Sequence, residues 1–295
     1  MCQVCETAGP VTARSSLRSA RLVLLSAGVQ RRAMRALSDA AARAELRAVE
    51  RLKGAVMETA ERRLTELWER VGREAAERVS DVLSANPLAG GRAAFMRQDV
   101  LAESVLSYDE LVASLRGVVD DETRAALREG FRSGRLRLDR TDIRLDFESR
   151  RVSDGLDRIV RQVEESALTA SDDVARVVQD GLADGDSVTD IASRINEVIG
   201  GQARDRAQKI ASTSVNSGFE IAQMEAYERA EIERKAWLST RDSAVRDTHD
   251  DADGQEVALD EPFIVGGAEL MHPGDPFGPI DEIVRCRCTS RPIVS

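Results

Sequence analysis

Aromatic residues are scarce in this chain: Phe, Trp and Tyr together make up 3% of its 295 residues. A core built almost without them must consist mainly of Leu, Val, Ile and Ala, which suits helices packed on helices better than packed sheets. The composition is otherwise that of a folded chain, with 42% hydrophobic and 32% charged residues. The scarcity of aromatic residues therefore predicts a mainly α fold.

Long apolar runs are also missing near the N-terminus, where the longest is Leu22–Leu25. A signal-peptide core needs about seven or more apolar residues, and a membrane span needs about 20. We therefore expect a protein that is made in the cytoplasm and has no membrane anchor.

Cysteine is rare, and its four copies form two terminal pairs, Cys2 with Cys5 and Cys286 with Cys288. Four cysteines so placed are too few for the disulfide framework of a small secreted protein. Reduced thiols or a bound metal are the expected uses.

Familiar catalytic motifs are missing as well: there is no glycine-rich phosphate loop, no HExxH and no serine elbow. An Asp, His and Cys set near the C-terminus can in principle supply a nucleophile and a base. Without a supporting motif, we predict that the protein is not an enzyme.

Charge is distributed unevenly around a net value of −10. Residues 14–35 hold six arginines and no acid, whereas residues 242–282 hold twelve acids and one base. The basic segment predicts contact with phosphate or an acidic partner, and its candidate nucleic-acid contacts are Arg31, Arg32 and Arg35. The alternative is that these arginines form a solvated helix face, in a chain that has Arg in place of Lys at almost every basic position.

No proline lies between Pro87 and Pro262, a gap that permits long helices, and four more prolines follow Pro262. Helical spacing of apolar residues predicts one long helix or a broken pair over 11–83, helices near 98–133, 152–180 and 203–234, and a shorter one that contains Ile191, Ile195 and Val198. A capping box is expected at Ser187 and Asp190, and Gly200-Gly201 should close the helix that follows.

The C-terminal part of the sequence lacks this helical pattern and has short apolar segments separated by turn residues. We expect strands at 237–240, 263–265 and 283–284, and a strand or an extended arm at 136–147. The predicted fold class is mainly α with a small α+β C-terminal domain. Its expected regions are a long amphipathic helical region at 1–91, a helical middle region at 92–202 and the C-terminal domain at 203–295.

Several signatures follow one another in the last third of the chain: RAQKIASTSVNSGFEIAQMEAYERA, KAWLSTRDSAVRDTHDDADGQEV, EPFIVGG, HPGDPFGP and CRC. In this order they resemble the C-terminal domain of the Mu F-like phage head-morphogenesis family, the minor head proteins of tailed phages. Two departures are visible. Ser212-Thr213-Ser214 stands where the family often has Arg-Thr-Glu, and Arg285 stands where it often has Asn.

The resemblance implies a minor head protein of a tailed phage or prophage, present in the host cytoplasm during assembly and then in the phage head. It implies binding to the portal and other head proteins as an oligomer, with packaged DNA as a further partner, in support of head assembly, DNA packaging or DNA ejection. Two alternatives remain, a phage-borne toxin or nuclease that uses the same domain and a non-specific DNA-binding helical protein.

Residues of the tail predict a polar structural motif, whose members are Trp237, Asp242, Arg246, His249, Asp253, Gly254, Pro273, Gly274, Asp275 and Pro276. Asp242, Arg246 and His249 are spaced to share one face of a helix, where the first two can pair. The Asp253-Gly254 pair predicts a turn, because Gly tolerates a positive φ.

A metal is the second way to hold such a small domain together. Alternate residues of an extended segment point to one side, so Cys286 and Cys288 can bind one ion together with His249 and His272. Zinc is the expected ion. The alternative is that Cys2 and Cys5 supply half of a four-cysteine site.

Overall fold

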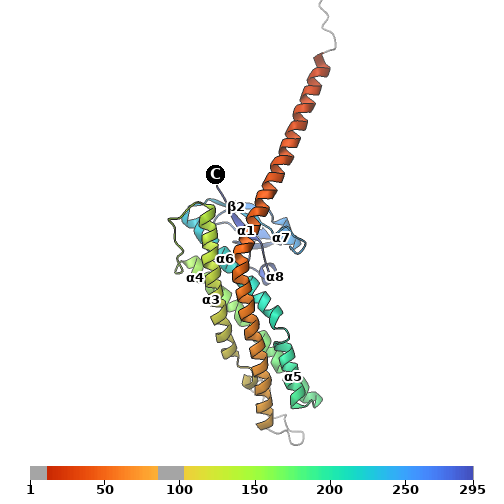
Figure 1. Cartoon of the computed structure of the whole chain (residues 1–295), viewed down its shortest axis with the longest axis vertical. Coiled ribbons are helices and arrows are strands. Elements are labelled where there is room, and N and C mark those ends of the chain that lie inside the picture. The colour runs from red at the N-terminus through yellow and green to blue at the C-terminus, as the bar shows by residue number, and fades with distance from the viewer. Residues whose placement is uncertain (1–11, 86–102, 295) are drawn as a thin grey trace, which may run out of the picture. The chain divides into compact units, whose positions relative to one another are not determined.

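The computed structural model describes residues 12–85 and 103–294, of which the side chains of 12–39 and 85 lie outside the description. Helices dominate: α1 (Thr12–Ala85), α3 (Tyr108–Arg137), α4 (Arg150–Asp184), α5 (Val188–Ile199) and α6 (Ala203–Arg229) (Figure 1). The mainly α fold class with a small α+β C-terminal part is confirmed. Among the described residues, no helix is long and apolar enough to cross a membrane.

The chain divides into two compact units between Ala48 and Val49, inside α1. This division coincides with neither of the predicted boundaries, 91/92 and 202/203, so the three predicted regions stay predictions. All contacts discussed below lie within the second unit.

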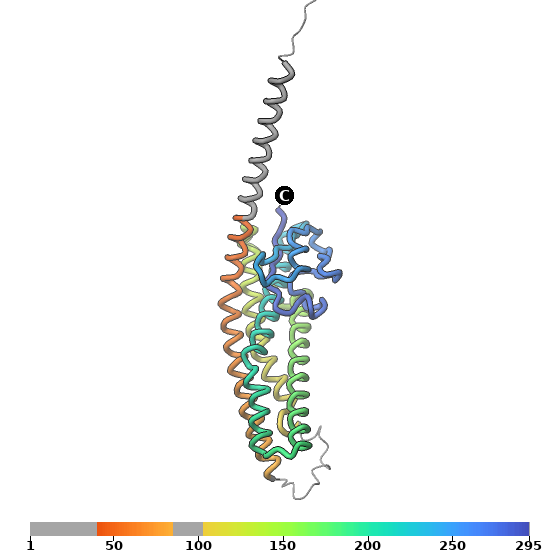
Figure 2. Tube along the Cα trace, turned by 90° about the vertical axis from the view of Figure 1, so that its right-hand side faces the viewer, coloured from red at the N-terminus to blue at the C-terminus, as the bar shows by residue number. Residues whose placement is uncertain are grey.

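The core of this second unit is built by helices that run alongside one another, namely α1 from Val49 onward, α3, α4 and α6 (Figure 2). On α1 the buried side chains recur every three or four residues: Ala60, Leu64, Leu67, Trp68, Val71, Ala75, Val79 and Leu83. This spacing places them on one face of the helix. At the crossing of α3 and α6, a Cβ built on Gly130 would lie 2.1 Å from the carbonyl oxygen of Phe219, so only glycine permits this close approach.

Local signals in the middle of the chain were mostly correct. Ser187 caps α5 with the expected reciprocal bonds to Asp190, and α5 ends at Ile199, directly before the glycine pair. The segment 136–147 contains no strand: α3 continues to Arg137, and the rest is irregular, with Ile143 buried against the helical core. The prediction of a strand there is therefore wrong.

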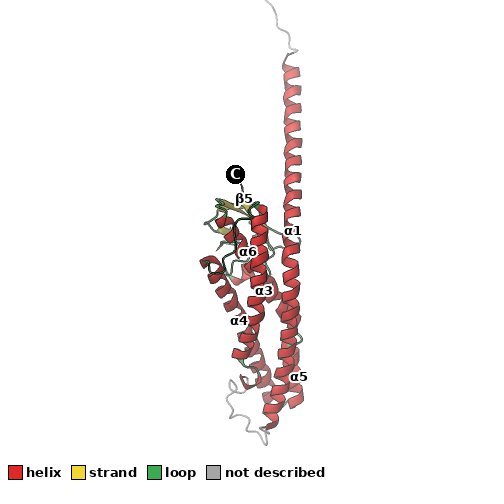
Figure 3. Cartoon of the chain, turned by 60° about the vertical axis from the view of Figure 1, so that its left-hand side comes forward, coloured by secondary structure: helices red, strands yellow, loops and turns green. Residues whose placement is uncertain are grey.

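The C-terminal strands gather at one end of the helices (Figure 3). β1 (Arg234–Leu238) lies between β2 (Glu256–Ala258) and β5 (Thr289–Ile293), antiparallel to both, while β3 (Phe263–Val265) and β4 (Ala268–Leu270) form a separate hairpin. Two short helices, α7 (Asp247–Asp251) and α8 (Ile280–Ile283), interrupt the loops. The strand predicted at 283–284 is wrong, because Ile283 ends α8. We call residues 234–294 the C-terminal module.

Helix α6 is buried along most of its length, since every residue from Ile210 to Tyr227 is buried. One part of its surface packs against α3 and α4, and another meets the C-terminal module. A helix buried on all sides is normally apolar. This one carries Asn216, Glu220 and Gln223, so these polar groups need partners inside the protein.

The partners form one buried network that joins three segments. Lys53 of α1 donates to the side chains of Asn216 (2.5 Å) and Glu220 (2.9 Å) and to the carbonyl oxygen of Cys288 (3.3 Å). Glu220 also accepts from the Thr289 hydroxyl and from both the backbone N–H and the hydroxyl of Ser290. Burial alone would raise the pKa of Glu220, but Lys53 and these hydrogen bonds lower it below its usual range.

Removal of Lys53 should be costly, because it leaves Glu220 charged and unpaired in the interior. We expect Lys53→Ala to lower the free energy of unfolding by about 3–5 kcal/mol in urea titrations. Arg62→Ala, which breaks an exposed pair with Glu66 on the same helix, should cost at most about 0.5 kcal/mol. Equal costs for the two variants would contradict this account of the network.

The same pair predicts a pH dependence. A carboxyl group whose pKa is lowered by folding adds stability above its unfolded pKa, and this stability is lost as the pH falls through the folded value. For Glu220 the loss should therefore begin below its ordinary pKa of 4.5.

Candidate metal centre and the loops around it

Three candidate metal ligands meet inside the C-terminal module. His249 lies on α7, and Cys286 and Cys288 lie in the extended segment between α8 and β5. Each of the three is about 1% exposed, and their ligand atoms all lie within 4.8 Å of one another. The sequence prediction that both thiols face one side together with His249 is thus realised in the geometry.

The distances fit a tetrahedral ion. With Zn–S bonds of about 2.3 Å and Zn–N bonds of about 2.0–2.1 Å, two ligand atoms of a tetrahedron lie about 3.6 Å apart. Nδ1 of His249 lies 3.7 Å from Sγ of Cys286 and 3.5 Å from Sγ of Cys288. Two thiols and one imidazole are also the ligand types that zinc prefers. The cluster can therefore hold a metal.

The ring of His249 is oriented for this role by its other nitrogen. Nε2 donates to a carboxylate oxygen of Glu282 at 3.1 Å, and the Thr248 hydroxyl donates to the same oxygen at 2.9 Å. With its proton on Nε2, the imidazole presents the lone pair of Nδ1 to the two thiols. Trp237 meets the ring edge to face at 5.4 Å and fixes its tilt. Sequence inspection did not single out Glu282, because it is one acid among twelve in the tail.

The two thiols have opposite pKa shifts. The hydrogen bond from the Cys286 thiol to the Cys288 sulfur lowers the pKa of Cys288 despite its burial. The same hydrogen bond, together with burial, raises the pKa of Cys286. A bound cation would favour loss of both thiol protons.

The predicted fourth ligand, His272, lies elsewhere. Among the described residues, the cluster contains His249, Cys286 and Cys288 and no other His, Cys, Asp or Glu. His272 is buried beside the loop at Pro273, and its burial lowers the pKa of the ring. The inclusion of His272 in the site was wrong because sequence spacing does not reveal which side of α6 each loop approaches. Cys2 and Cys5 lie outside the described residues.

The predicted helical face of Asp242, Arg246 and His249 does not form. Helix α7 begins only at Asp247, with Arg246 as its N-cap, and Asp242 lies in the preceding turn. Asp242 binds both terminal nitrogens of Arg287, at 2.6 and 2.7 Å, while Arg246 donates to the carbonyl oxygen of Val284. Both side chains thus hold the segment that carries the thiols, from two directions.

The turn at Asp253-Gly254 is present, with φ of +80° at Gly254. The Asp253 carboxylate accepts from the backbone N–H of Ser239 at 2.9 Å and pairs with Arg241. Arg285, the second departure from the family pattern, has φ of +55°, a region that Asn adopts more easily, and its N–H donates to the Thr213 hydroxyl. That threonine also belongs to the first departure from the pattern.

The loop from Pro273 to Pro276 is fixed to the helices by its carbonyl groups. Ser217 of α6 donates to the carbonyl of Gly274 at 2.6 Å, and Arg158 and Gln162 of α4 donate to that of Pro276. Inside the loop, the buried Asp275 carboxylate accepts from the N–H groups of Met271 (2.7 Å) and Phe277 (3.0 Å). The loop is therefore held in one conformation, which displays the Phe277 side chain with the residue 61% exposed.

The Asp275 carboxylate is the main group that holds this loop in its conformation. We expect Asp275→Ala to leave two partly buried N–H groups unpaired and to lower the free energy of unfolding by about 1–3 kcal/mol. Asp281→Ala, which removes an exposed carboxylate of the same charge nearby, should change it by at most about 0.5 kcal/mol. Denaturant titrations of both variants test the difference, and indistinguishable midpoints would rule out the capping role.

The candidate nucleic-acid contacts Arg31, Arg32 and Arg35 lie in the first half of α1, and their side chains lie outside the described residues. Their proposed role therefore stays a prediction.

Comparison with known families identifies the C-terminal part of the chain. Residues 172–291 match the family described as "Phage Mu protein F like protein". The resemblance predicted from the motifs is thereby confirmed, and the matched region begins earlier than expected, inside α4. It contains all of α5 and α6 and the three candidate metal ligands.

Two curated relatives share parts of the chain. One, from Enterococcus faecalis (strain ATCC 700802 / V583), is named NAD(+)--arginine ADP-ribosyltransferase EFV and is 36% identical over 39% of this chain and 24% of its own length. Another is the Bacillus subtilis (strain 168) "Uncharacterized protein YqbB", 29% identical over 43% of each chain. The chain thus spans about a quarter and under half of the lengths of these relatives. No solved structure matches.

Proposed function

We propose that this chain is a minor head protein of a tailed phage or prophage. It associates with the portal and the head interior, and it supports head assembly, DNA packaging or DNA ejection. The observation that carries this proposal is the match of residues 172–291 to the phage Mu protein F like family. In this proposal the protein works in the host cytoplasm during assembly and then within the phage head.

The geometry of the candidate metal centre favours a structural role for the C-terminal module. Its three ligand side chains are about 1% exposed, so a substrate would have no direct access to them. Each is held by neighbours from separate segments: His249 by Glu282, and the thiol segment by Arg246 and by Lys53. Contacts of this kind fix the loops of the module to one another, and such links stabilise a small domain.

We assign zinc to this centre. The ion would be held by His249 Nδ1 and the two thiolates, with a fourth ligand from outside this cluster, and it would replace part of the apolar core that a module of this size lacks. The charge balance agrees, because loss of the two thiol protons compensates the double charge of the ion.

Metal content is the direct test of this assignment. The purified full chain should contain about one equivalent of zinc by elemental analysis, and Cys288→Ser should remove most of it and lower the melting temperature. His272→Asn is the matched control, since it removes a buried histidine of the same module outside the cluster and should leave the zinc content unchanged. Equal loss in both variants, or no metal in the unmodified chain, would exclude the site as described.

Portal binding tests the proposed function itself. We expect the full chain, co-expressed with a cognate portal protein, to co-elute with the portal oligomer in size-exclusion chromatography. We propose the long N-terminal helix as the association surface, so a variant that begins at residue 40 should lose most of this binding. Separate elution of the full chain at micromolar concentration would contradict the proposal.

The basic segment at 14–35 extends the proposal to packaged DNA. Binding through Arg31, Arg32 and Arg35 would be sequence-independent and would weaken steeply with salt, because each phosphate contact releases counterions.

An enzymatic alternative deserves a direct assay because one relative is named as an ADP-ribosyltransferase. The matched part covers only 24% of that relative, so its activity does not transfer with the match. Incubation of the full chain with labelled NAD⁺ and an arginine acceptor separates the two functions. Transfer of label would favour the transferase over the structural protein.

A further inference from the structure

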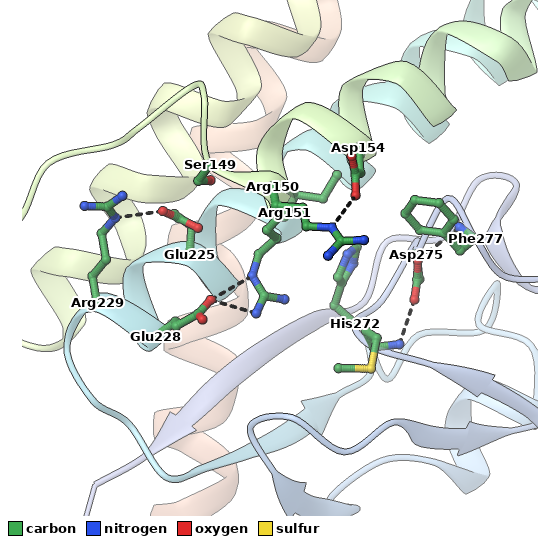
Figure 4. A pocket seen from close by; sticks show the side chains of 13 residues that line it. Ser149, Arg150, Arg151, Asp154, Glu225, Glu228, Arg229, His272, Asp275 and Phe277 are labelled. Atoms are coloured by element: carbon green, nitrogen blue, oxygen red, sulfur yellow. Dashed lines mark hydrogen bonds and ion pairs between the residues drawn. The ribbon is translucent and has the colours of Figure 1, made fainter.

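A separate cavity of about 670 Å³ opens between the first turn of α4, the last turns of α6 and the loop at 271–277 (Figure 4). None of the three candidate metal ligands lines it. Its volume lies within the range of about 300–1,000 Å³ that is usual for small-molecule sites.

The charges on the cavity wall are mostly neutralised by one another. Three arginines each have a carboxylate partner: Arg151 with Glu228 at 2.8 Å, Arg229 with Glu225 at 2.7 Å, and Arg150 with Asp154 at 3.4 Å. The third pair is long, and the side chain of Arg150 is 95% exposed. Arg150 is therefore free to turn toward a ligand at little cost.

The start of α4 offers unused hydrogen-bond donors to the cavity. Ser149 is the N-cap, yet its hydroxyl caps no backbone N–H, and this buried oxygen has no partner among the described residues. The first turn contains no acid. The free N–H groups of a helix start, together with the helix dipole, favour a negative charge at this place.

A second, independent group points into the cavity from the opposite loop. His272 is only 4% exposed, and its Nδ1–H donates to the carbonyl oxygen of Pro273 at 3.2 Å. Nε2 of His272 is therefore a hydrogen-bond acceptor. It has no partner among residues 103–294 or in the described part of α1. In Figure 4 the ring rises from the loop between Arg151 and Phe277, and Phe277 forms the far wall with an exposed aromatic face.

We propose that this cavity binds a nucleoside monophosphate. The phosphate lies at the start of α4, where the free N–H groups and Arg150 donate to it. A ribose hydroxyl donates to Nε2 of His272, and the flat base stacks on Phe277. A single phosphate suits a wall whose other arginines are already paired.

Isothermal titration of the full chain with AMP, adenosine and inorganic phosphate tests the proposal. AMP should bind saturably with a dissociation constant below about 1 mM. Adenosine and inorganic phosphate should each bind at least about tenfold more weakly, because adenosine lacks the phosphate and inorganic phosphate lacks the nucleoside.

Four variants assign the contacts. Arg150→Gln should weaken AMP binding at least about tenfold, the effect of one lost charge-assisted hydrogen bond. His272→Asn keeps a donor for the Pro273 carbonyl but lacks the outer nitrogen, and Phe277→Ala removes the stacking face. Both substitutions should weaken AMP binding and leave phosphate binding unchanged. Arg161→Gln, at an exposed arginine of α4 outside the cavity, is the control and should have no effect.

Three outcomes would overturn the proposal. They are no saturable AMP binding at millimolar concentration, equal affinity for AMP and inorganic phosphate, and AMP affinity that Arg150→Gln does not change. Circular dichroism and melting curves of every variant exclude loss of folding as the cause. The proposal is independent of portal binding, so either can fail without the other.

Discussion

The buried ion pair between Lys53 and Glu220 fixes three distant segments of the chain against one another. Lys53 comes from the long first helix, Glu220 from the middle of α6, and the carbonyl of Cys288 shares the same ammonium group. Charges that are buried and unpaired are expensive, so this network is satisfied in one register of the three segments only. The position of the thiol segment therefore depends on a residue more than 200 positions earlier in the chain.

Helix α6 consequently serves both parts of the chain, the helical core through apolar contacts and the C-terminal module through polar ones. The helical core packs against Ile210, Val215 and Ile221, while Ser217, Glu220 and Gln223 hold the loops and strands of the C-terminal module. The sequence predicted a polar motif or a metal to hold this small domain together. Phe277, one of its few aromatic residues, is exposed, and α6 supplies polar partners to the module. A bound zinc would add to that support rather than replace it.

The sequence predicted local features well and spatial neighbours poorly. Helix spacing, the Ser187 cap and the positive φ of Gly254 depend on adjacent residues, and all three are present. His249 and the two thiols could be grouped because they are rare residues in a family motif. Lys53, Glu282 and the exclusion of His272 could not be foreseen, since each depends on contacts between segments that are distant in the sequence.

The central claim is that α6 makes the helical core and the C-terminal module one cooperative unit. The chain contains two tryptophans, and the structure places Trp68 in the first core and Trp237 in the second. Fluorescence of single-tryptophan variants, Trp68→Phe and Trp237→Phe, therefore reports the two parts separately during unfolding in urea. Circular dichroism on the same samples measures how far each substitution shifts the urea midpoint of the helices. In each variant, the fluorescence midpoint and the dichroism midpoint should coincide. A Trp237 transition that precedes the loss of helix would contradict the claim.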